Sequence, residues 1–299
     1  MTMAQAHLIG VDWGTSHLRV FRIGGAGAVL EARASPAGMG SLAREGFEPA
    51  LWKVLAGWED LPVVCCGMVG AKQGWVEAPY ARAPADPADL AARMIRAPTV
   101  RSVWVVPGVA QYAASGDLDD VMRGEEVQIA GVMDGHATGL VICPGTHCKW
   151  VDVEGGRIAR FRTFMTGELH ALLSLQSVLR HSVGETATPS AAFRAAVARS
   201  LDGEPLSSAL FSIRVATLGE RMTQADASAA LSGLLVGAEI AAARREFAVG
   251  PSEVVGSPAL CRLYAAALDV AGFGPATLRD AGQATPHGLW RIWTKAACA

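Results

Sequence analysis

The chain carries the same short motif twice, once in each half of its length. VDWGTSHLRV begins at residue 11 and CPGTHCKWVDV begins at residue 143, so Gly14-Thr15 corresponds to Gly145-Thr146, 131 positions later (145 − 14). In both copies an apolar run precedes the Gly-Thr pair and another follows it, a pattern typical of two strands joined by a tight turn. A motif repeated at matching places predicts a fold built from a duplicated unit.

The length of 299 residues favours two domains, since about 150 residues per domain is usual. We expect these domains to span residues 1–133 and 134–299. The first half has a helical pattern in FEPALWKVLAGWED and buried-strand patterns in PVVCCGMVG and VRSVWVVPG. The second half has strand patterns in SEVVGSP and ATLRD, and residues 185–232 are mostly helical in pattern. Strands followed by helices in each half indicate the α/β class.

Composition excludes several classes of partner. Hydrophobic residues make up 51% of the chain and charged residues 18%, which is typical of a folded globular protein. The net charge of −2 gives no sign of binding to nucleic acid or to an anionic membrane. The most apolar stretch, LSGLLVGAEIAAA, contains Glu239 and is too short to cross a bilayer. We therefore expect small-molecule ligands, with a homodimer as the default assembly.

The cysteines and the N-terminus predict a cytoplasmic protein. None of the six cysteines forms a C-x-x-C pair, and a chain of this length does not need a disulfide framework. Reduced thiols are typical of the cytoplasm. The N-terminal MTMAQAHLIGVDWG has no basic segment ahead of its apolar run, so it does not resemble a signal peptide.

The Gly-Thr turns have the chemistry of a phosphate site. Successive backbone N–H groups and hydroxyls, as in Gly14, Thr15 and Ser16, form a concave arc that can bind phosphate oxygens. Asp12 would lie beside that arc, where its carboxylate could hold a Mg²⁺ ion that bridges the phosphates. An ordinary hairpin with an incidental aspartate is the alternative for one copy alone. The second copy, at Gly145, favours the phosphate interpretation.

Several other nucleotide and metal motifs are absent or coincidental. No G-x-x-x-x-G-K-[ST] sequence occurs in the chain. Gly38 and Gly40 match the loose dinucleotide fingerprint, but no buried strand precedes them, so we interpret the match as chance. His147 and Cys148 are neighbours on an expected strand and would point to opposite faces, which argues against a shared metal ion.

Two neighbouring glutamates begin an expected helix in MRGEEVQIAGV. Acidic residues in a first helical turn are stabilised by the helix dipole, which is the structural explanation for Glu125 and Glu126. The functional explanation is that one of them accepts a proton from an attacking hydroxyl. Only one can face a given site, because neighbouring residues on a helix point about 100° apart. We prefer Glu125 and keep Glu126 as the alternative.

Two loops combine glycines with polar and aromatic side chains after expected strands, where small-molecule sites are common. The segment FRTFMTGELH places a threonine at a strand-to-helix junction, where it could cap the helix or leave N–H groups for a ligand. These loops supply the candidate substrate-binding residues Gly67, Lys72, Gln73, Trp75, Tyr80, Thr166, Gly167 and Glu168. Near the C-terminus, Gly256-Ser257 forms a tight turn where an adenine or a ribose could pack.

Together these segments identify a family. DWGTSHLR, GMVGAKQGW, VMRGEEVQ, PGTHCKWV, FRTFMTGEL and LSGLLVGAE closely resemble the 2-dehydro-3-deoxygalactonokinases, from Ile9 to about Trp290. The resemblance implies an α/β fold of two ribonuclease-H-like (actin-type ATPase) domains with a central cleft between them. It also implies that the γ-phosphoryl group of ATP is transferred to the 6-hydroxyl of 2-dehydro-3-deoxy-D-galactonate, in galactonate catabolism.

The resemblance implies roles for individual residues. Asp12 would organise Mg²⁺, and Lys149 would neutralise charge if it faces the phosphates. Gly14, Thr15, Ser16, Gly145 and Thr146 would hold phosphates, and Gly256 and Ser257 would contact adenosine. The RGEE segment is similar to one that carries a glutamate base in related enzymes, without distinguishing its two glutamates. The substrate is a carboxylate, and the cations considered for it are Arg162, Lys72 and Arg123.

The sequence departs from the family pattern at two places, and two other functions compete with the one that the resemblance implies. Cys143 stands where related domains often have an aspartate, and Pro286 is expected to interrupt the final helix. The nearest rival is a kinase for another keto-deoxy acid, such as the gluconate epimer. The second is an actin-type nucleotide sensor, which would need neither a base nor a sugar pocket. The crowded loops at residues 67–80 and 161–170 argue against the sensor.

Overall fold

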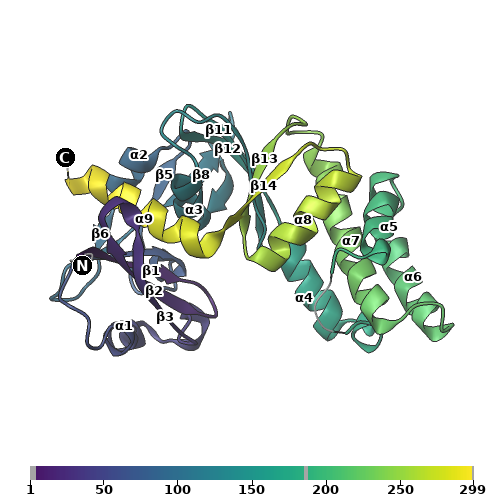
Figure 1. The fold of residues 1–299 in the computed structure, drawn as a ribbon, viewed down its shortest axis with the longest axis horizontal. Coiled ribbons are helices and arrows are strands. Elements are labelled where there is room, and N and C mark those ends of the chain that lie inside the picture. The colour runs from purple at the N-terminus through teal and green to yellow at the C-terminus, as the bar shows by residue number, and fades with distance from the viewer. Residues whose placement is uncertain (1–4, 185–187, 298–299) are drawn as a thin grey trace. The chain divides into compact units, whose positions relative to one another are not determined.

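The computed structural model describes residues 5–184 and 188–297, which form two compact units (Figure 1). Unit 1 comprises Met1–Thr138, Val153–Phe161 and Ala281–Ala299. Unit 2 comprises Gly139–Asp152 and Arg162–Asp280. The predicted helical stretch 185–232 therefore includes three positions, 185–187, that lie outside the described residues.

Unit 1 is built on a six-stranded sheet in the order β3-β2-β1-β4-β7-β6. Its strands are β1 (Ala6–Trp13), β2 (Leu18–Gly24), β3 (Val29–Ser35), β4 (Val63–Gly67), β6 (Ile95–Arg96) and β7 (Val103–Val105). The first three strands are antiparallel neighbours, whereas β4 and β7 continue the sheet parallel to β1. This arrangement is the ribonuclease-H-like topology that the resemblance implies. It brings the carboxyl ends of β1 and β4 to the same edge.

A second, three-stranded sheet in unit 1 was not predicted from the sequence. It has the order β5-β8-β9. Its strands are β5 (Tyr80–Arg82), β8 (Gly108–Tyr112) and β9 (Leu118–Met122). The helices α1 (Phe47–Val54), α2 (Pro87–Ala91) and α3 (Glu125–Val132) complete this part of the unit. Strand β9 leads directly into α3, so the small sheet sets where the two glutamates begin their helix.

The core of unit 1 lies under the hairpin that carries the first Gly-Thr turn. Trp13, at the end of β1, packs against Phe47 with ring centroids 4.9 Å apart, and both rings contact Trp75. All three aromatic side chains are buried. Aromatic rings bury large apolar areas, so this cluster stabilises the end of β1 next to the turn.

The C-terminal helix α9 (Ala281–Ala297) belongs to unit 1. The sequence had instead placed all residues after 133 in the second domain. Gly131 of α3 and Gly288 of α9 explain the difference. A Cβ atom at either position would overlap the backbone of the other helix, at Ala284 or Val127. The two helices therefore approach closely, side by side in Figure 1. Pro286 lies inside α9 without ending it, so the predicted interruption is wrong.

Unit 2 repeats the topology of unit 1. Its sheet has the order β12-β11-β10-β13-β14. The strands are β10 (Gly139–Cys143), β11 (Cys148–Glu154), β12 (Arg157–Phe164), β13 (Ser252–Gly256) and β14 (Ala276–Asp280). As in unit 1, the strand before the Gly-Thr turn pairs in parallel with the fourth strand, and this strand pairs in parallel with the fifth. The predicted duplication is confirmed by this matching strand order.

Helices fill the rest of unit 2. They are α4 (Thr166–Gln176), α5 (Ala191–Leu201), α6 (Leu206–Leu218), α7 (Gln224–Ala243) and α8 (Pro258–Val270). Among the described residues, α7 is the helix that is long and apolar enough to span a membrane. It is longer than the apolar stretch LSGLLVGAEIAAA, from which the sequence predicted a helix too short to cross a bilayer. Most of that helix is buried in unit 2, with small residues such as Gly233 and Gly237 against α5. It packs as a core helix.

Candidate active site

The β1–β2 turn has the backbone geometry of an anion site. The carbonyl oxygens of Gly14 and Thr15 accept hydrogen bonds from the amides of Met39 and Gly40, at 3.0 and 2.9 Å. In a trans peptide the N–H group points away from the preceding carbonyl. The amides of Thr15 and Ser16 therefore face away from the Met39–Gly40 segment, in exposed residues. Consecutive outward N–H groups of this kind bind anions such as phosphate.

Gly38 allows the supporting segment to lie against the turn. A Cβ atom at this position would overlap the backbone of Thr15 and Ser16. The sequence around Gly38 matches a dinucleotide fingerprint by chance and does not predict this contact. The structure gives the glycine a different function, which is to support the phosphate-type turn from behind.

Asp12 lies at the end of β1 beside this turn. Its side chain is 13% exposed and forms an ion pair with Arg19, its cross-strand partner on β2. Burial raises the pKa of the Asp12 carboxyl, whereas Arg19 acts in the opposite direction. A cavity of about 290 Å³ is lined by Asp12, Gly14, Ser16, His17 and Arg19. The carboxylate and the turn thus face the same space. Sequence analysis missed Arg19, although hairpin register could have placed it opposite Asp12.

The end of β4 and the beginning of α3 reach the same edge as Asp12. Gly67 adopts a φ of +86°, and a Cβ there would lie 2.8 Å from the carbonyl oxygen of Trp13. The Cα of Gly67 in turn approaches Gly124, the residue before α3. Glu125 follows, and its negative charge contributes to the raised pKa of Asp12. Gly67, Asp12 and Glu125 therefore belong to one local site in unit 1.

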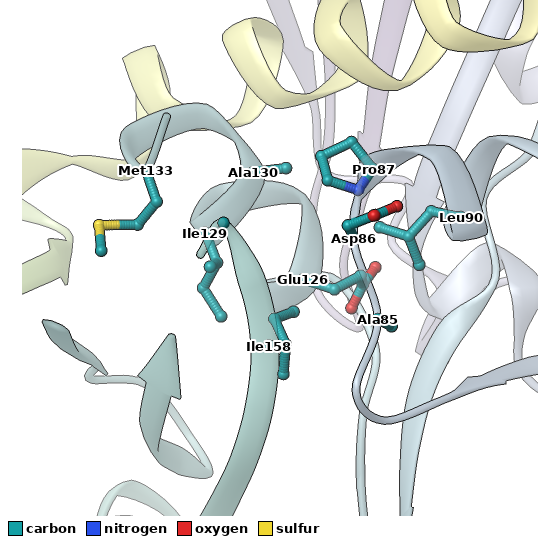
Figure 2. A pocket seen from close by; sticks show the side chains of 10 residues that line it. Ala85, Asp86, Pro87, Leu90, Glu126, Ile129, Ala130, Met133 and Ile158 are labelled. Carbon is teal, nitrogen blue, oxygen red and sulfur yellow. The ribbon is translucent and has the colours of Figure 1, made fainter. Parts of the chain in front are cut away.

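Glu126 points into a different, closed environment (Figure 2). Its side chain is fully buried, and its Oε2 accepts a hydrogen bond of 2.7 Å from the Gly124 amide. Burial, followed by repulsion from Glu125, raises the pKa of Glu126 to about 8. The carboxyl group lines a small space of about 10 Å³ among mostly apolar side chains that include Leu90, Ile129 and Ile158. Such a space has room for roughly one water molecule and none for a sugar.

The substrate-binding residues predicted in the loop at 67–80 differ in their exposure to solvent. Lys72 and Gln73 are exposed, whereas Trp75 is buried in the core cluster described above. Tyr80 is half exposed, and its ring lies 4.3 Å from the guanidinium carbon of Arg123. The structure thus separates Trp75, a packing residue, from the side chains of this loop that a ligand can reach.

Arg123 has unsatisfied hydrogen-bond donors. Its Nη2 donates to the carbonyl oxygen of Ala78 at 2.9 Å. Within the described part of the chain, its buried Nε and Nη1 atoms have no hydrogen-bond partner. The guanidinium lies against Gly70 and Ala78, and its positive charge acts on Glu126. An arginine with unpaired N–H groups is suited to bind a carboxylate.

The second Gly-Thr turn, between β10 and β11, is supported by the start of α4. The Glu168 amide donates to the carbonyl oxygen of Thr146 at 2.9 Å, and a Cβ at Gly167 would overlap the carbonyl of Gly145. By the same peptide geometry, the amides of Thr146 and His147 point away from α4. The turn is therefore supported from one side, as in unit 1.

Side chains around this turn are held by local contacts. His147 Nε2 lies 2.6 Å from a carboxylate oxygen of Glu168. Lys149 is buried, and its Nζ donates to the carbonyl oxygen of His147 at 3.1 Å. The Lys149 ammonium group is thus placed directly behind the turn.

The other predicted residues of unit 2 have different surroundings. Thr166 is buried and donates to the carboxylate of Glu239, so its hydroxyl does not face a ligand. Arg162 forms an ion pair of 3.0 Å with Glu246. Gly256 ends β13 close to the carbonyl oxygen of Pro144, and Ser257 caps α8 through the Leu260 amide.

The donor set for a cation in unit 1 consists of carboxylates. Within the described residues, no group of three or more histidine, cysteine, aspartate and glutamate side chains is arranged to hold a metal ion. Mg²⁺, however, is usually bound by one or two carboxylates together with water and phosphate oxygens. Asp12, with Glu125 nearby, has the hard oxygen ligands that this ion prefers. The residues present therefore fit Mg²⁺ bound together with a phosphate ligand.

Known proteins resemble the chain over nearly its whole length. The probable kinase of Rhizobium meliloti (strain 1021) named 2-dehydro-3-deoxygalactonokinase DgoK1 is 42% identical over 300 residues, with 97% of each chain covered. The 2-dehydro-3-deoxygalactonokinase of Escherichia coli (strain K12) is 36% identical over 241 residues, covering 80% of this chain and 81% of the relative.

Solved structures agree with these relatives. A crystal structure of a Sinorhizobium meliloti protein assigned as a 2-dehydro-3-deoxygalactonokinase has a TM-score of 0.86 and 39% identity, covering 96% of this chain and 98% of that one. The activator of 2-hydroxyisocaproyl-CoA dehydratase from Clostridium difficile has a TM-score of 0.56 at 13% identity, covering 98% and 96%, and shows the shared fold alone. A family model described as 2-keto-3-deoxy-galactonokinase matches residues 12–292. The chain therefore belongs to the 2-keto-3-deoxy-galactonokinase family.

Proposed function

We propose that the chain is an ATP-dependent kinase that phosphorylates the 6-hydroxyl of 2-dehydro-3-deoxy-D-galactonate. Its family membership supports a sugar-acid kinase of this kind. The observation that carries the chemistry is the convergence of Asp12, the outward amides of the β1–β2 turn and Glu125 at one edge of the sheet. Phosphoryl transfer depends mainly on positioning and charge neutralisation, and these groups supply both.

Each group has a distinct role in the proposed reaction. The amides of Thr15 and Ser16 hold phosphate oxygens of ATP, and Gly38 supports them from behind. Glu125 accepts the proton of the sugar hydroxyl as its oxygen bonds to the γ-phosphorus. The bond from that phosphorus to the bridging oxygen breaks at the same time, which releases ADP. Asp12 would bind Mg²⁺, which supplies positive charge that stabilises the transferring phosphoryl group.

The turn of unit 2 supports a parallel proposal. Gly145 and Thr146 would bind phosphate oxygens of ATP through the amides that face away from α4, with the Lys149 ammonium group behind them. Gly256 and Ser257 would contact the adenosine, since they form the turn from β13 into α8. The five described cysteines are buried, in keeping with a reaction in the cytoplasm.

The test of this function is ADP release with Mg²⁺-ATP and three acceptor conditions. We expect a high rate with 2-dehydro-3-deoxygalactonate, a lower rate with its gluconate epimer and a negligible rate without sugar acid. Equal rates with both epimers would favour a broader keto-deoxy acid kinase. ATP turnover that ignores the sugar acid would instead favour an actin-type sensor and overturn the kinase proposal.

Arg123 is the cation that we expect to bind the carboxylate of the sugar acid. Its unpaired Nε and Nη1 groups would gain charge-assisted hydrogen bonds, once the half-exposed Tyr80 ring moves aside. Substituting Arg123→Met should raise KM for the sugar acid by roughly 10- to 100-fold, because a hydrogen bond to a charged group contributes about 1.5–3 kcal/mol. KM for ATP should change little.

Two variants serve as controls for this prediction. Arg162→Met removes a cation that is already paired with Glu246, and Lys72→Met removes an exposed one. Both should leave KM for the sugar acid within about twofold, as is usual for surface substitutions. A large rise in KM for Arg162→Met, with no effect at Arg123, would assign the carboxylate to the other unit.

A further inference from the structure

Glu239 is a buried carboxylate in the middle of the apolar helix α7. It is 3% exposed. Its Oε1 accepts a hydrogen bond of 2.7 Å from Trp150 Nε1, and its Oε2 accepts from the Tyr264 hydroxyl at 2.8 Å and from the Thr166 hydroxyl. The Cys148 thiol contacts the same carboxylate. A buried charged or polar group is costly unless it is well hydrogen-bonded, so four partners on one carboxylate indicate a built network.

The partners of Glu239 come from both sides of the Gly145-Thr146 turn. Cys148 and Trp150 belong to β11, the strand that leaves the turn. Thr166 is the first residue of α4, the helix that supports the turn from behind. The carboxylate therefore joins the strand that follows the turn to the helix on which the turn rests.

The connection from Thr166 to the turn is short. The next residue, Gly167, packs so closely on Gly145 that a Cβ would overlap its carbonyl oxygen. The residue after it, Glu168, donates its amide to Thr146. A shift of Thr166 at the start of α4 would thus move the two contacts that hold the turn.

The other partner, Tyr264, offers a contrast within the same network. It lies in α8 and donates to the same oxygen, Oε2, as Thr166. It also forms a side-chain hydrogen bond with Cys148 of β11, and its other neighbours in the core of unit 2 include Cys261 and Leu263 on its own helix. Loss of either hydroxyl leaves Glu239 one donor short, but only Thr166 adjoins Gly167.

We propose that Glu239 is a positioning residue for the Gly145-Thr146 turn and acts through Thr166. It fixes the start of α4, and hence the direction of the backbone amides that face an anionic ligand. The identity of that ligand as the phosphate of ATP rests on the proposed function. The positioning of the turn does not.

The test compares Thr166→Val with Tyr264→Phe in the whole protein. We expect amide hydrogen exchange across residues 145–148 to quicken by roughly tenfold in Thr166→Val, the loss expected for one hydrogen bond to a charged group. The dissociation constant of a non-hydrolysable ATP analogue, measured with Mg²⁺ by calorimetry, should rise by a similar factor. KM for the sugar acid should stay within about twofold, because its site is proposed in unit 1.

Tyr264→Phe is the matched control. It should lower the thermal unfolding temperature to a similar extent, yet leave exchange at residues 145–147, which precede its contact Cys148, and affinity for the analogue within about twofold. Glu239→Gln keeps one acceptor and should give an intermediate exchange rate. Equal exchange rates at the turn in the threonine and tyrosine variants would overturn the proposal, because Glu239 would then serve only the core.

The outcomes also separate this proposal from the proposed function. If the wild-type protein binds no ATP analogue while Thr166→Val still loosens the turn, positioning stands and the kinase proposal fails. If the analogue binds and exchange at residues 145–148 is unchanged in Thr166→Val, the kinase proposal stands and positioning fails.

Discussion

Substituting Asp12→Asn is expected to lower kcat by on the order of a thousandfold while the protein remains folded, because a metal-organising carboxylate stabilises the transition state by several kcal/mol. Asparagine has nearly the same shape and can still accept a hydrogen bond from Arg19. It lacks the negative charge that attracts Mg²⁺ to the cavity beside the β1–β2 turn. The measurement is kcat as a function of Mg²⁺ concentration, together with thermal unfolding.

Glu31→Gln is the matched control for Asp12→Asn. Arg22 of β2 and Glu31 of β3 are cross-strand partners, as Arg19 of β2 and Asp12 of β1 are. Both glutamate and arginine in the control pair are partly exposed, so the pair contributes about 0–1 kcal/mol. Its loss should leave kcat and the dependence on Mg²⁺ unchanged. The same kcat in Asp12→Asn, with the same dependence on Mg²⁺, would exclude a metal role for Asp12.

The duplicated architecture follows from local sequence signals. Each Gly-Thr pair lies between two apolar runs, and a hairpin is the structure that such a pattern encodes. The same signals place Asp12 at the end of a strand and Glu125 at the start of a helix. Their meeting near the first turn could not be predicted, because β9, which leads into α3, belongs to the three-stranded sheet that the sequence did not reveal.

Long-range packing could not be predicted in this way. Trp75 occurs in a glycine-rich loop, where an aromatic ring often contacts a ligand, yet its ring packs against Trp13 of β1 and Phe47 of α1. Thr166 has the sequence context of a helix cap, but its hydroxyl turns toward Glu239, which is 73 positions away in the chain. In both cases a distant segment decides which way the side chain points.

The placement of α9 has the same origin. Helix propensity can predict a final helix, but not the sheet against which it packs. The decisive signal is a pair of glycines, Gly131 and Gly288, that are far apart in the chain and meet only in the folded protein. This contact also steadies α3, whose first turn carries Glu125. The C-terminal helix is therefore part of the framework of the proposed active site.

Glu125→Gln and Glu126→Gln are expected to differ in their effect on kcat. Loss of a general base lowers kcat by typically 10²- to 10⁴-fold, so we expect a decrease of this size for Glu125→Gln, with KM for both substrates little changed. Glu125 interacts with Asp12 at the proposed reaction site. Glu126→Gln should leave kcat within a few-fold, because its carboxyl group is buried beside a space among Leu90, Ile129 and Ile158 that is too small for a sugar. Steady-state rates near neutral pH measure both.

Glu126→Gln should instead change how stability depends on pH. The folded protein holds the Glu126 carboxyl with a pKa of about 8, against 4.5 for the free group, so between these values the folded state binds a proton that the unfolded state has released. This contribution to the free energy of unfolding is complete below pH 4.5 and is lost as the pH rises through 8. Glutamine resembles the protonated acid and does not titrate.

Urea unfolding of the wild type and of Glu126→Gln from pH 5 to pH 8 tests this difference. The wild type should lose on the order of 3–4 kcal/mol relative to the variant over that range, since each pKa unit corresponds to about 1.4 kcal/mol. Parallel curves would mean that Glu126 is ionised in the folded protein, as a reacting base would be. If Glu126→Gln also lost turnover while Glu125→Gln kept it, the two glutamates would exchange roles. A buried acid that holds its proton at neutral pH cannot accept one from a sugar hydroxyl, so the stability curve and the rates must agree on the same base.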